Sequence, residues 1–290
     1  MRADVAESID DFPAEDWNRL AGHRYPFLRH EFLRAAESSG CVSAETGWRP
    51  RHIGLRDNSG RLVAAMPLYE KTHSWGEFVF DWSWAHAYER AGLDYYPKLV
   101  STVPFTPAPS QRLLAASPDN AAALIEAACD LSTRHGYSSL HVLFPERREL
   151  DVLEDAGLKL RRDCQFHWHN QDYANFDEFL ATFSSSKRKK VRRDRRHVAE
   201  QGIRCRRLRG SETDHAIWND VYQLISITFL RRGSLPYFSQ AFFEELSERL
   251  PESVMVVMAE KNRMPIAAAV FYDTADTLYG RYWGADADYN

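Results

Sequence analysis

Two segments far apart in the chain share a residue pattern, and this similarity restricts the fold more than any other sequence feature. Residues 52–69 align without a gap with residues 255–272, which places two acidic turn residues, two Ala pairs and the tyrosines Tyr69 and Tyr272 in equivalent positions. Each segment follows two predicted helices and leads into a third, aromatic-rich strand. Two copies of one α/β unit would explain this pattern.

We therefore predict two domains of α/β (α+β) class, with mixed sheets flanked by helices. The first domain is expected to span residues 1–169 and the second residues 170–290. After its hairpin, the first domain continues with helices near residues 119–135 and 148–156 and strands near 137–144 and 158–169. The second copy stops after its third strand and is therefore predicted to be incomplete.

Residues 81–109 combine aromatic rings, charges and four prolines in a pattern typical of a long surface loop, which follows a strand predicted near residues 77–82. Trp82 and Tyr88 offer ring faces that can stack on bases or sugars, and Lys98 can meet a phosphate. The candidate proton acceptors in this stretch are Asp81, His86, Glu89 and Asp94. An aromatic mini-core beneath the loop would account for the same rings.

The most basic stretch is residues 184–209, which hold 12 of the 37 Lys and Arg residues against only Asp194 and Glu200, although the whole chain has a net charge of −4. A helix is expected to begin near Lys187 behind serine N-caps. Like charges one turn apart destabilise such a helix by about 0.2–0.5 kcal/mol per pair, and a bound polyanion would relieve this repulsion. The alternative is a solvated helix paired with acidic surface elsewhere.

Helical spacing of apolar residues predicts two further helices, near residues 213–230 and 240–250, with Ser211 as the N-cap of the first. Arg231 and Arg232 follow directly, before a Gly-Pro turn that leads to Tyr237. Paired arginines at such a turn suit anion capture, although surface solubility is their commoner explanation. Three strands, near residues 254–260, 264–272 and 277–283, are expected to finish the chain.

Several motifs that would identify other enzyme classes are missing from the sequence. It contains no G-x-G-x-x-G, P-loop or G-x-S-x-G pattern, so nothing indicates a Rossmann dinucleotide site, a Walker site or an α/β-hydrolase. His167 and His169 have a metal-ligand spacing, but polar positions on a half-exposed strand explain them better, and no metal is assigned.

The cysteines and the apolar runs indicate where such a chain works. Cys41, Cys129, Cys164 and Cys205 are scattered and form no C-x-x-C pair, which is typical of free thiols in a reducing compartment. The N-terminus lacks the apolar region of a signal peptide, and no run reaches the ~18 apolar residues of a membrane-spanning helix. A cytoplasmic location is therefore expected.

Five motifs are spread over nearly the whole chain: FDWSWAHAYERAGLDYYPKL at 80–99, FHWHN at 166–170, the SSSKRKKVRRDRR run, TFLRRGSLPY at 228–237 and TLYGRYWG at 277–284. Together they resemble the FemAB-like family of predicted N-acyltransferases, which is linked to peptidoglycan biosynthesis or recognition. The resemblance implies tandem GNAT-like acyltransferase domains. The better-known Fem relatives transfer an amino acid from aminoacyl-tRNA to the peptide of a cell-wall precursor.

The resemblance implies an N-acyltransferase in which an amine attacks an activated ester or thioester. The acyl donor would be aminoacyl-tRNA or acyl-CoA, no cofactor is certain, and the partner would be tRNA or a phosphorylated cell-wall precursor. With the charges and rings above, it assigns acceptor binding to Trp82, Tyr88 and Lys98. Phosphate or carboxylate groups would be oriented by Arg231, Arg232, Tyr237 and Arg281, and the polyanionic part of the donor would be held by Lys187, Arg188 and Arg192.

In this family a further block with acidic, His and Lys residues normally follows the YGRYWG strand and completes the second domain. The block is absent from this sequence, so the chain is expected to be a C-terminally truncated member. A second hypothesis is a non-catalytic RNA- or cell-wall-precursor-binding protein that uses the same basic and aromatic surfaces. The sequence identifies neither the catalytic base nor the oligomeric state.

Overall fold

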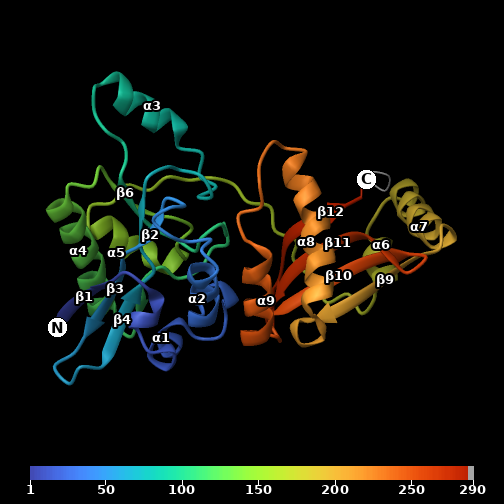
Figure 1. The fold of residues 1–290 in the computed structure, drawn as a ribbon, viewed down its shortest axis with the longest axis horizontal. Helices are drawn as coiled ribbons and strands as arrows, with labels where there is room; N and C mark the ends of the chain where they lie inside the picture. Colours follow the sequence, from blue (N-terminus) through green and yellow to red (C-terminus); the bar gives the residue numbers. More distant parts are fainter. Residues whose placement is uncertain (287–290) are drawn as a thin grey trace.

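The computed structural model of the protein describes residues 1–286, which contain runs of strands and runs of helices (Figure 1). The strands are β1 (Arg2–Ala6), β2 (Trp48–Pro50), β3 (His52–Arg56), β4 (Leu62–Met66), β5 (Tyr69–Lys71), β6 (Lys98–Ser101), β7 (Leu114–Ala115), β8 (Leu140–Val142), β9 (Ile203–Arg209), β10 (Val254–Lys261), β11 (Met264–Asp273) and β12 (Leu278–Ala285). The helices are α1 (Ala14–Ala21), α2 (His30–Ser38), α3 (Trp82–Arg90), α4 (Pro118–His135), α5 (Leu150–Asp155), α6 (Phe176–Ala181), α7 (Ser185–Glu200), α8 (His215–Leu230) and α9 (Gln240–Arg249).

The strands of the described residues form three sheets of four strands each, two in the first half of the chain and one in the second. Their strand orders are β1-β3-β4-β7, β2-β5-β6-β8 and β12-β11-β10-β9. Neighbouring strands are antiparallel except for β6 and β8, which run parallel. The α/β (α+β) fold class predicted from the sequence is therefore confirmed, with sheets that are mostly antiparallel.

The two similar sequence segments both form antiparallel hairpins, β3–β4 and β10–β11. In both halves an earlier strand, β1 or β9, pairs with the first strand of the hairpin, and two helices lie between them in the sequence. Leu55 lies opposite Ala64 in the first hairpin, whereas its counterpart Met258 lies opposite Ala268 rather than Ala267 in the second. The strand pairing of the second hairpin is therefore shifted by one residue from the pairing that the ungapped alignment predicts. The domain boundary at residues 169 and 170 stays a prediction.

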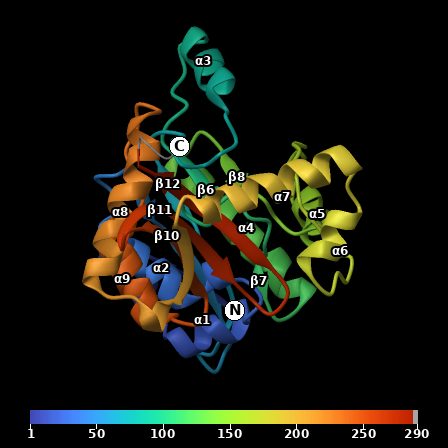
Figure 2. The same ribbon diagram turned by 90° about the vertical axis from the view of Figure 1, so that its right-hand side faces the viewer.

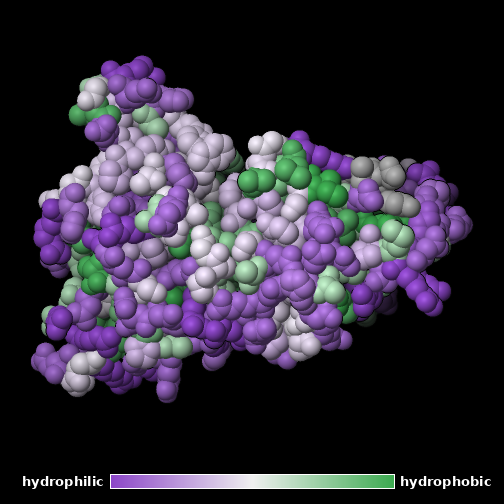
Figure 3. Space-filling model, in the orientation of Figure 1, coloured by the Kyte–Doolittle hydropathy of each residue, from purple (hydrophilic) through white to green (hydrophobic). Residues whose placement is uncertain are grey.

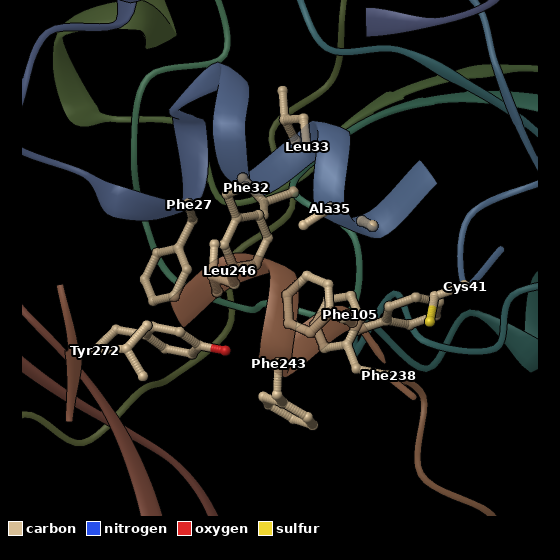
Figure 4. Close-up of a cluster of buried hydrophobic side chains, with 14 of the residues drawn as sticks. Phe27, Phe32, Leu33, Ala35, Cys41, Phe105, Phe238, Phe243, Leu246 and Tyr272 are labelled. Atoms are coloured by element: carbon tan, nitrogen blue, oxygen red, sulfur yellow. The ribbon is translucent and has the colours of Figure 1, made fainter. Parts of the chain in front are cut away.

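A shared aromatic core joins the two halves (Figure 4). Phe32 of α2 lies with its ring centroid 5.3 Å from that of Phe242 on α9 and 5.9 Å from that of Tyr272 on β11. Phe27, directly before α2, contacts the same tyrosine at 5.1 Å. Because aromatic side chains bury large areas, this contact holds the halves together and fixes the residues that meet between them.

Most predicted helix ends are confirmed. Ser117 caps α4, and Gly136 ends it with a φ of 68°, which a residue without a Cβ adopts at no steric cost. Ser184 caps α7 as expected. The N-cap predicted for α8 is wrong, because Ser211 lies in a 3-10 turn and Asp214 instead accepts a hydrogen bond from the backbone N–H of Ile217 at 2.8 Å.

Two predicted strands are wrong. Residues 77–82 form no strand but lead into α3, whose Ala, Glu and Arg residues favour a helix and which projects from the body of the molecule (Figures 1 and 2). The loop predicted for residues 81–109 is wrong for the same reason and also contains β6. Residues 158–169 are irregular and almost entirely exposed, because no strand among residues 1–286 pairs with them. Among residues 1–286, no helix has the length and apolar character needed to cross a bilayer.

Candidate functional site

A set of charges is fully buried at the start of β6. Lys98 is 0% exposed, and its Nζ lies 2.9 Å from a carboxylate oxygen of Glu77 and 2.5 Å from one of Asp81. It also donates a hydrogen bond to Ser74 Oγ at 3.0 Å. Burying a charge is very unfavourable unless the charge is paired, so the two carboxylates are what permits this lysine in the core.

The two carboxyl groups have opposite pKa shifts. Burial raises the pKa of Glu77, although Lys98 acts against it. Burial also acts to raise the pKa of Asp81, but hydrogen bonds from Lys98 and Tyr95 outweigh it and hold that pKa at about 2. Tyr95 donates from Oη to Asp81 at 2.6 Å. Asp81 is therefore ionised at neutral pH, and Glu77 is the carboxyl group that takes up a proton more readily.

A second buried lysine, Lys71 of β5, lies directly opposite Lys98 across the β5–β6 pair. Its Nζ lies 3.7 Å from the centroid of the Trp48 ring and donates to the carbonyl oxygen of Gly47 at 3.1 Å. Burial lowers the pKa of Lys71 to about 7; Glu77 opposes this shift and Lys98 adds to it. Two cations facing each other across strands repel, which is a further reason for the carboxylates beside them.

His141 of β8 connects these buried charges to a cavity. Its Nε2 lies 3.5 Å from Tyr95 Oη and 2.9 Å from Ser139 Oγ. Burial, followed by the positive charges of Lys98 and Arg161, lowers the pKa of His141 to about 4. The imidazole is therefore neutral at pH 7 and can accept a proton.

The cavity beside His141 has a volume of about 630 Å³, which is within the range of small-molecule pockets. Its walls come from Val79, from β8 and the turn after it, from α5, and from residues 158–167. Most of the lining is aliphatic, and Lys159, Arg161 and Arg162 add positive charge. Val79 lies between Glu77 and Asp81 in the sequence, so one short segment separates the cavity from the buried charges.

Two predicted site residues from the second half of the chain meet the first half at an aromatic junction. Tyr237 stacks on Phe105, with ring centroids 5.0 Å apart and planes inclined by 7°. Arg281 donates a hydrogen bond to the carbonyl oxygen of Phe105, and its guanidinium lies 5.9 Å from the ring centroid of Phe78. Phe78 and Phe105 have φ angles of 62° and 54°. Such a conformation is strained for a residue with a Cβ, and strain of this kind concentrates at functional sites.

The other residues predicted for substrate binding are not brought together. Trp82 and Tyr88 lie on the projecting helix α3, where Tyr88 contacts Tyr95 with ring centroids 5.1 Å apart. Arg231 and Arg232 are exposed beyond the end of α8. Lys98, expected to meet a phosphate, has no exposed surface, so in this structure it contacts carboxylates instead.

The residues predicted to bind a polyanion lie on α7, at the end of the molecule opposite the buried charges, where the surface is mainly hydrophilic (Figures 1 and 3). Lys187 lies over the ring of Phe183, with its Nζ 4.7 Å from the centroid. Arg192 pairs with Asp177 at 2.8 Å, and Arg188 donates to the carbonyl oxygen of Ala181. Arg195 also covers the ring of Phe176, so α7 packs along α6, while Lys189, Lys190, Arg193 and Arg196 are exposed.

Sequence reasoning missed Glu77, Lys71 and His141 as site residues. For His141 the signal is an ionisable residue inside a short apolar segment, Leu140-His141-Val142, whereas Lys71 lies between Glu70 and Thr72 and has no such signal. The histidines that the sequence singled out were instead the His-x-His pair, because of their metal-ligand spacing. His167 and His169 lie in an irregular segment with rings 6.2 Å apart, and no group of three or more metal-binding side chains occurs in the described residues.

Comparisons with known proteins add a family and a fold. A sequence model of the FemAB-like family, described as peptidoglycan biosynthesis/recognition, matches residues 8–290. No curated protein sequence matches the chain. Among solved structures, the C-terminal domain (DUF2156) of an Agrobacterium fabrum protein described as a lysylphosphatidylglycerol synthetase is similar, with a TM-score of 0.52 and 11% identity over 96% of this chain and 69% of that one.

A second structure, L-PGS from Bacillus licheniformis, gives a TM-score of 0.47 and 13% identity over 90% of this chain and 66% of its own. At 11% identity, the Agrobacterium fabrum structure supports a common fold and says nothing about substrates.

Proposed function

Because this chain belongs to the FemAB-like family of peptidoglycan biosynthesis and recognition, we propose that it is an N-acyltransferase that moves an acyl or aminoacyl group to an amine. The donor would be aminoacyl-tRNA or an acyl thioester such as acyl-CoA, and the acceptor amine would belong to a peptidoglycan precursor. The observation that carries the proposal is the neutral His141, which lines the cavity and contacts Tyr95, and Tyr95 in turn is held by the buried Asp81 and Lys98.

The proposed reaction forms one C–N bond and breaks one C–O or C–S bond. The amine attacks the carbonyl carbon, the tetrahedral intermediate expels an alkoxide or thiolate, and one proton passes from the amine nitrogen to the leaving group. A side chain that accepts and returns this proton contributes about 10²–10⁴-fold to the rate. His141 is suited to this role because it is neutral at pH 7 and faces the cavity.

A pKa of about 4 makes His141 a weak base while the cavity is empty. Since positive charges on Lys98 and Arg161 contribute to this low pKa, an anionic donor bound nearby would offset them and raise the pKa toward neutral. Binding of the donor would thus make His141 a stronger base. The basic rim of the cavity would contribute to the reaction by attracting the anionic donor to this position.

Tyr95, Asp81 and Lys98 are proposed as positioning residues behind His141. Burial and the hydrogen bond to Asp81 raise the pKa of Tyr95 well above its usual range, so the phenol keeps its proton and donates a hydrogen bond to the carboxylate. Lys98 holds that carboxylate in place. The Tyr95 ring, which contacts the His141 ring with centroids 6.3 Å apart, is thereby fixed.

The surfaces predicted from the sequence keep their proposed roles in substrate binding. Tyr237 and Arg281 lie at the junction of the two halves, where they would orient a phosphate or carboxylate, and Arg231 and Arg232 would add charge nearby. Trp82 and Tyr88 would contact the acceptor. Lys187, Arg188 and Arg192 on α7 would hold a polyanionic donor, whose attraction depends on salt.

Transfer can be measured directly by mass spectrometry after incubating the protein with an amine-bearing peptidoglycan precursor and either aminoacyl-tRNA or acyl-CoA. We expect the mass of the precursor to rise by that of the transferred group. His141→Gln is expected to lower the rate at least ~100-fold, because a positioned base is lost. His135→Gln, which changes an exposed histidine of α4, serves as the matched control and is expected to keep the rate.

A folded His141→Gln variant with an unchanged rate would remove His141 from the mechanism. Binding of tRNA or precursor by the unaltered protein without any transfer would favour the non-catalytic binding protein.

A further inference from the structure

The cavity beside His141 joins an apolar wall to a cationic rim, a combination that fits one kind of small molecule. We propose that this cavity binds a single-chain amphiphile, with its aliphatic chain along the apolar wall and its anionic head at Lys159, Arg161 and Arg162. The use of such a molecule as the acyl donor rests on the proposed function, whereas its binding does not. The group that occupies the cavity would then be an apolar acyl chain and not an amino acid.

The apolar wall is extensive and comes from several elements. Leu140 and Val142 contribute from β8, Leu153 from α5, and Leu158 and Leu160 from the segment that follows. Leu160 is 43% exposed, which leaves apolar surface open at the mouth of the cavity. Each methylene group moved from water onto such a surface improves binding roughly fourfold. An aliphatic chain therefore gains affinity here that a polar aminoacyl group cannot.

The cationic rim is formed by three exposed side chains within four residues of sequence. Lys159, Arg161 and Arg162 form no ion pair with the carboxylates of residues 1–286, although Glu154 and Asp163 also line the cavity. Asp163 accepts a hydrogen bond from the backbone N–H of Cys164. Three cations against two carboxylates leave the rim positive, and arginine side chains are well suited to phosphate and carboxylate groups.

The inner end of the cavity lies near charges of both signs. Lys98 and Arg161 act against a proton on His141, whereas Asp81 acts in favour of one, so the pKa of His141 responds to charge placed in the cavity. Phe144, which lines the same wall, has a φ of 53°. A strained backbone beside a cavity with charged groups is typical of a ligand-binding wall.

The other basic surface offers a useful contrast. Helix α7 carries more cations than the cavity rim, but none of its residues lines this cavity. A simple anion is therefore expected to prefer α7, whereas a molecule with both an aliphatic chain and an anionic head is expected to prefer the cavity. The two sites can therefore be distinguished by whether the affinity of a ligand depends on its aliphatic chain.

Titration calorimetry with monomeric dodecyl phosphate tests the proposal, with inorganic phosphate and dodecanol as the two half-ligands. Dodecyl phosphate is expected to bind at least ~100-fold more tightly than inorganic phosphate, because the chain adds apolar contact. Replacing both rim arginines (Arg161→Gln with Arg162→Gln) is expected to lower the affinity for dodecyl phosphate at least ~10-fold and to leave the affinity for dodecanol unchanged. Leu160→Gln should weaken both chain-bearing ligands, and it changes an exposed position, so folding is retained.

A double change on α7, Lys189→Gln with Arg193→Gln, is the matched control and is expected to leave binding of dodecyl phosphate unchanged. Equal affinity for dodecyl phosphate and inorganic phosphate would overturn the proposal, as would binding that depends on α7 and not on the rim. Attachment to phosphatidylglycerol vesicles without binding of monomeric dodecyl phosphate would also overturn it, since the cavity would then play no part. Tight binding without acyl transfer would refute only the proposed function, and transfer of an aminoacyl group without amphiphile binding would refute only this inference.

Discussion

Lys98 and the lysines of α7 carry the same ammonium group in opposite environments. Lys98 is 0% exposed and contacts two carboxylates at 2.5 and 2.9 Å. Lys187, Lys189 and Lys190 are exposed on a helix without a single buried residue. The contrast teaches that dense charge in a sequence indicates a surface, whereas an isolated charge within an apolar segment indicates a core or a site.

The two environments also differ in what the charges do for stability. A buried charge depends on its partners, because removal of one partner leaves the others without compensation in a medium of low polarity. An exposed charge is solvated by water and screened by salt, so its removal changes the free energy of unfolding little. Four changes to the chain can break or sharpen this comparison.

The largest effect is expected from Lys98→Met. It leaves Glu77 and Asp81 buried beside each other without their shared cation, which should lower the free energy of unfolding by about 3–5 kcal/mol. Urea denaturation measures this change. Lys189→Met is the matched control on α7, with an expected change within about 0.5 kcal/mol. A Lys98→Met variant as stable as this control would show that the buried charges are not coupled as the distances indicate.

Removing the carboxylates together with the lysine sharpens the same test. If the loss of stability comes from uncompensated charge, then adding Glu77→Gln and Asp81→Asn to Lys98→Met should restore part of it. No recovery in the triple variant would indicate that poorer packing, rather than the absence of pairing, causes the effect.

A smaller effect, visible only as a pH dependence, is expected from Lys71→Met. The pKa of Lys71 is about 7 in the folded protein and about 10.5 when unfolded. Between these values the unfolded chain binds a proton that the folded one does not, so the stability of the fold rises with pH. Lys71 therefore destabilises the fold most below pH 7, where the folded protein must hold a buried charge, and this effect has disappeared above pH 10.5. The stability of the unaltered protein should therefore gain about 3 kcal/mol relative to Lys71→Met between pH 7 and pH 9.5. Denaturation at both pH values measures the difference, and a constant difference would contradict the lowered pKa.

The fold was predictable where local patterns decide it. The cap at Ser117, the stop at Gly136 and the alternating strands β10 and β11 all follow from residues next to each other in the sequence. Strands near residues 77–82 and 158–169 were predicted wrongly because a strand depends on a partner elsewhere in the chain. The residues of the strand itself do not indicate whether such a partner exists.

The site was less predictable than the fold for the same reason. Lys98 was selected from the sequence, but as an open phosphate contact, because its burial depends on Glu77 and Asp81 folding over it. The only local signal of His141 is its position between Leu140 and Val142, whereas its low pKa arises from its burial and from Lys98 and Arg161, which are far from it in the sequence. The basic helix α7, in contrast, was located correctly, since exposed charge needs no partner.

The smallest effect on stability, and a distinct effect on binding, is expected from Lys187→Gln with Arg192→Gln on α7. Each lost phosphate interaction should reduce the slope of log K against log salt by about 0.7–0.9, so the double variant should reduce it by about 1.4–1.8. Fluorescence anisotropy of labelled tRNA at several salt concentrations measures that slope, and the free energy of unfolding should stay within about 0.5 kcal/mol. Arg90→Gln with Arg134→Gln, two exposed cations of the first half, is the matched control with an unchanged slope. If both double variants lower the slope equally, then α7 is no more a polyanion site than any other charged surface of this protein, and the contrast with Lys98 would concern burial alone.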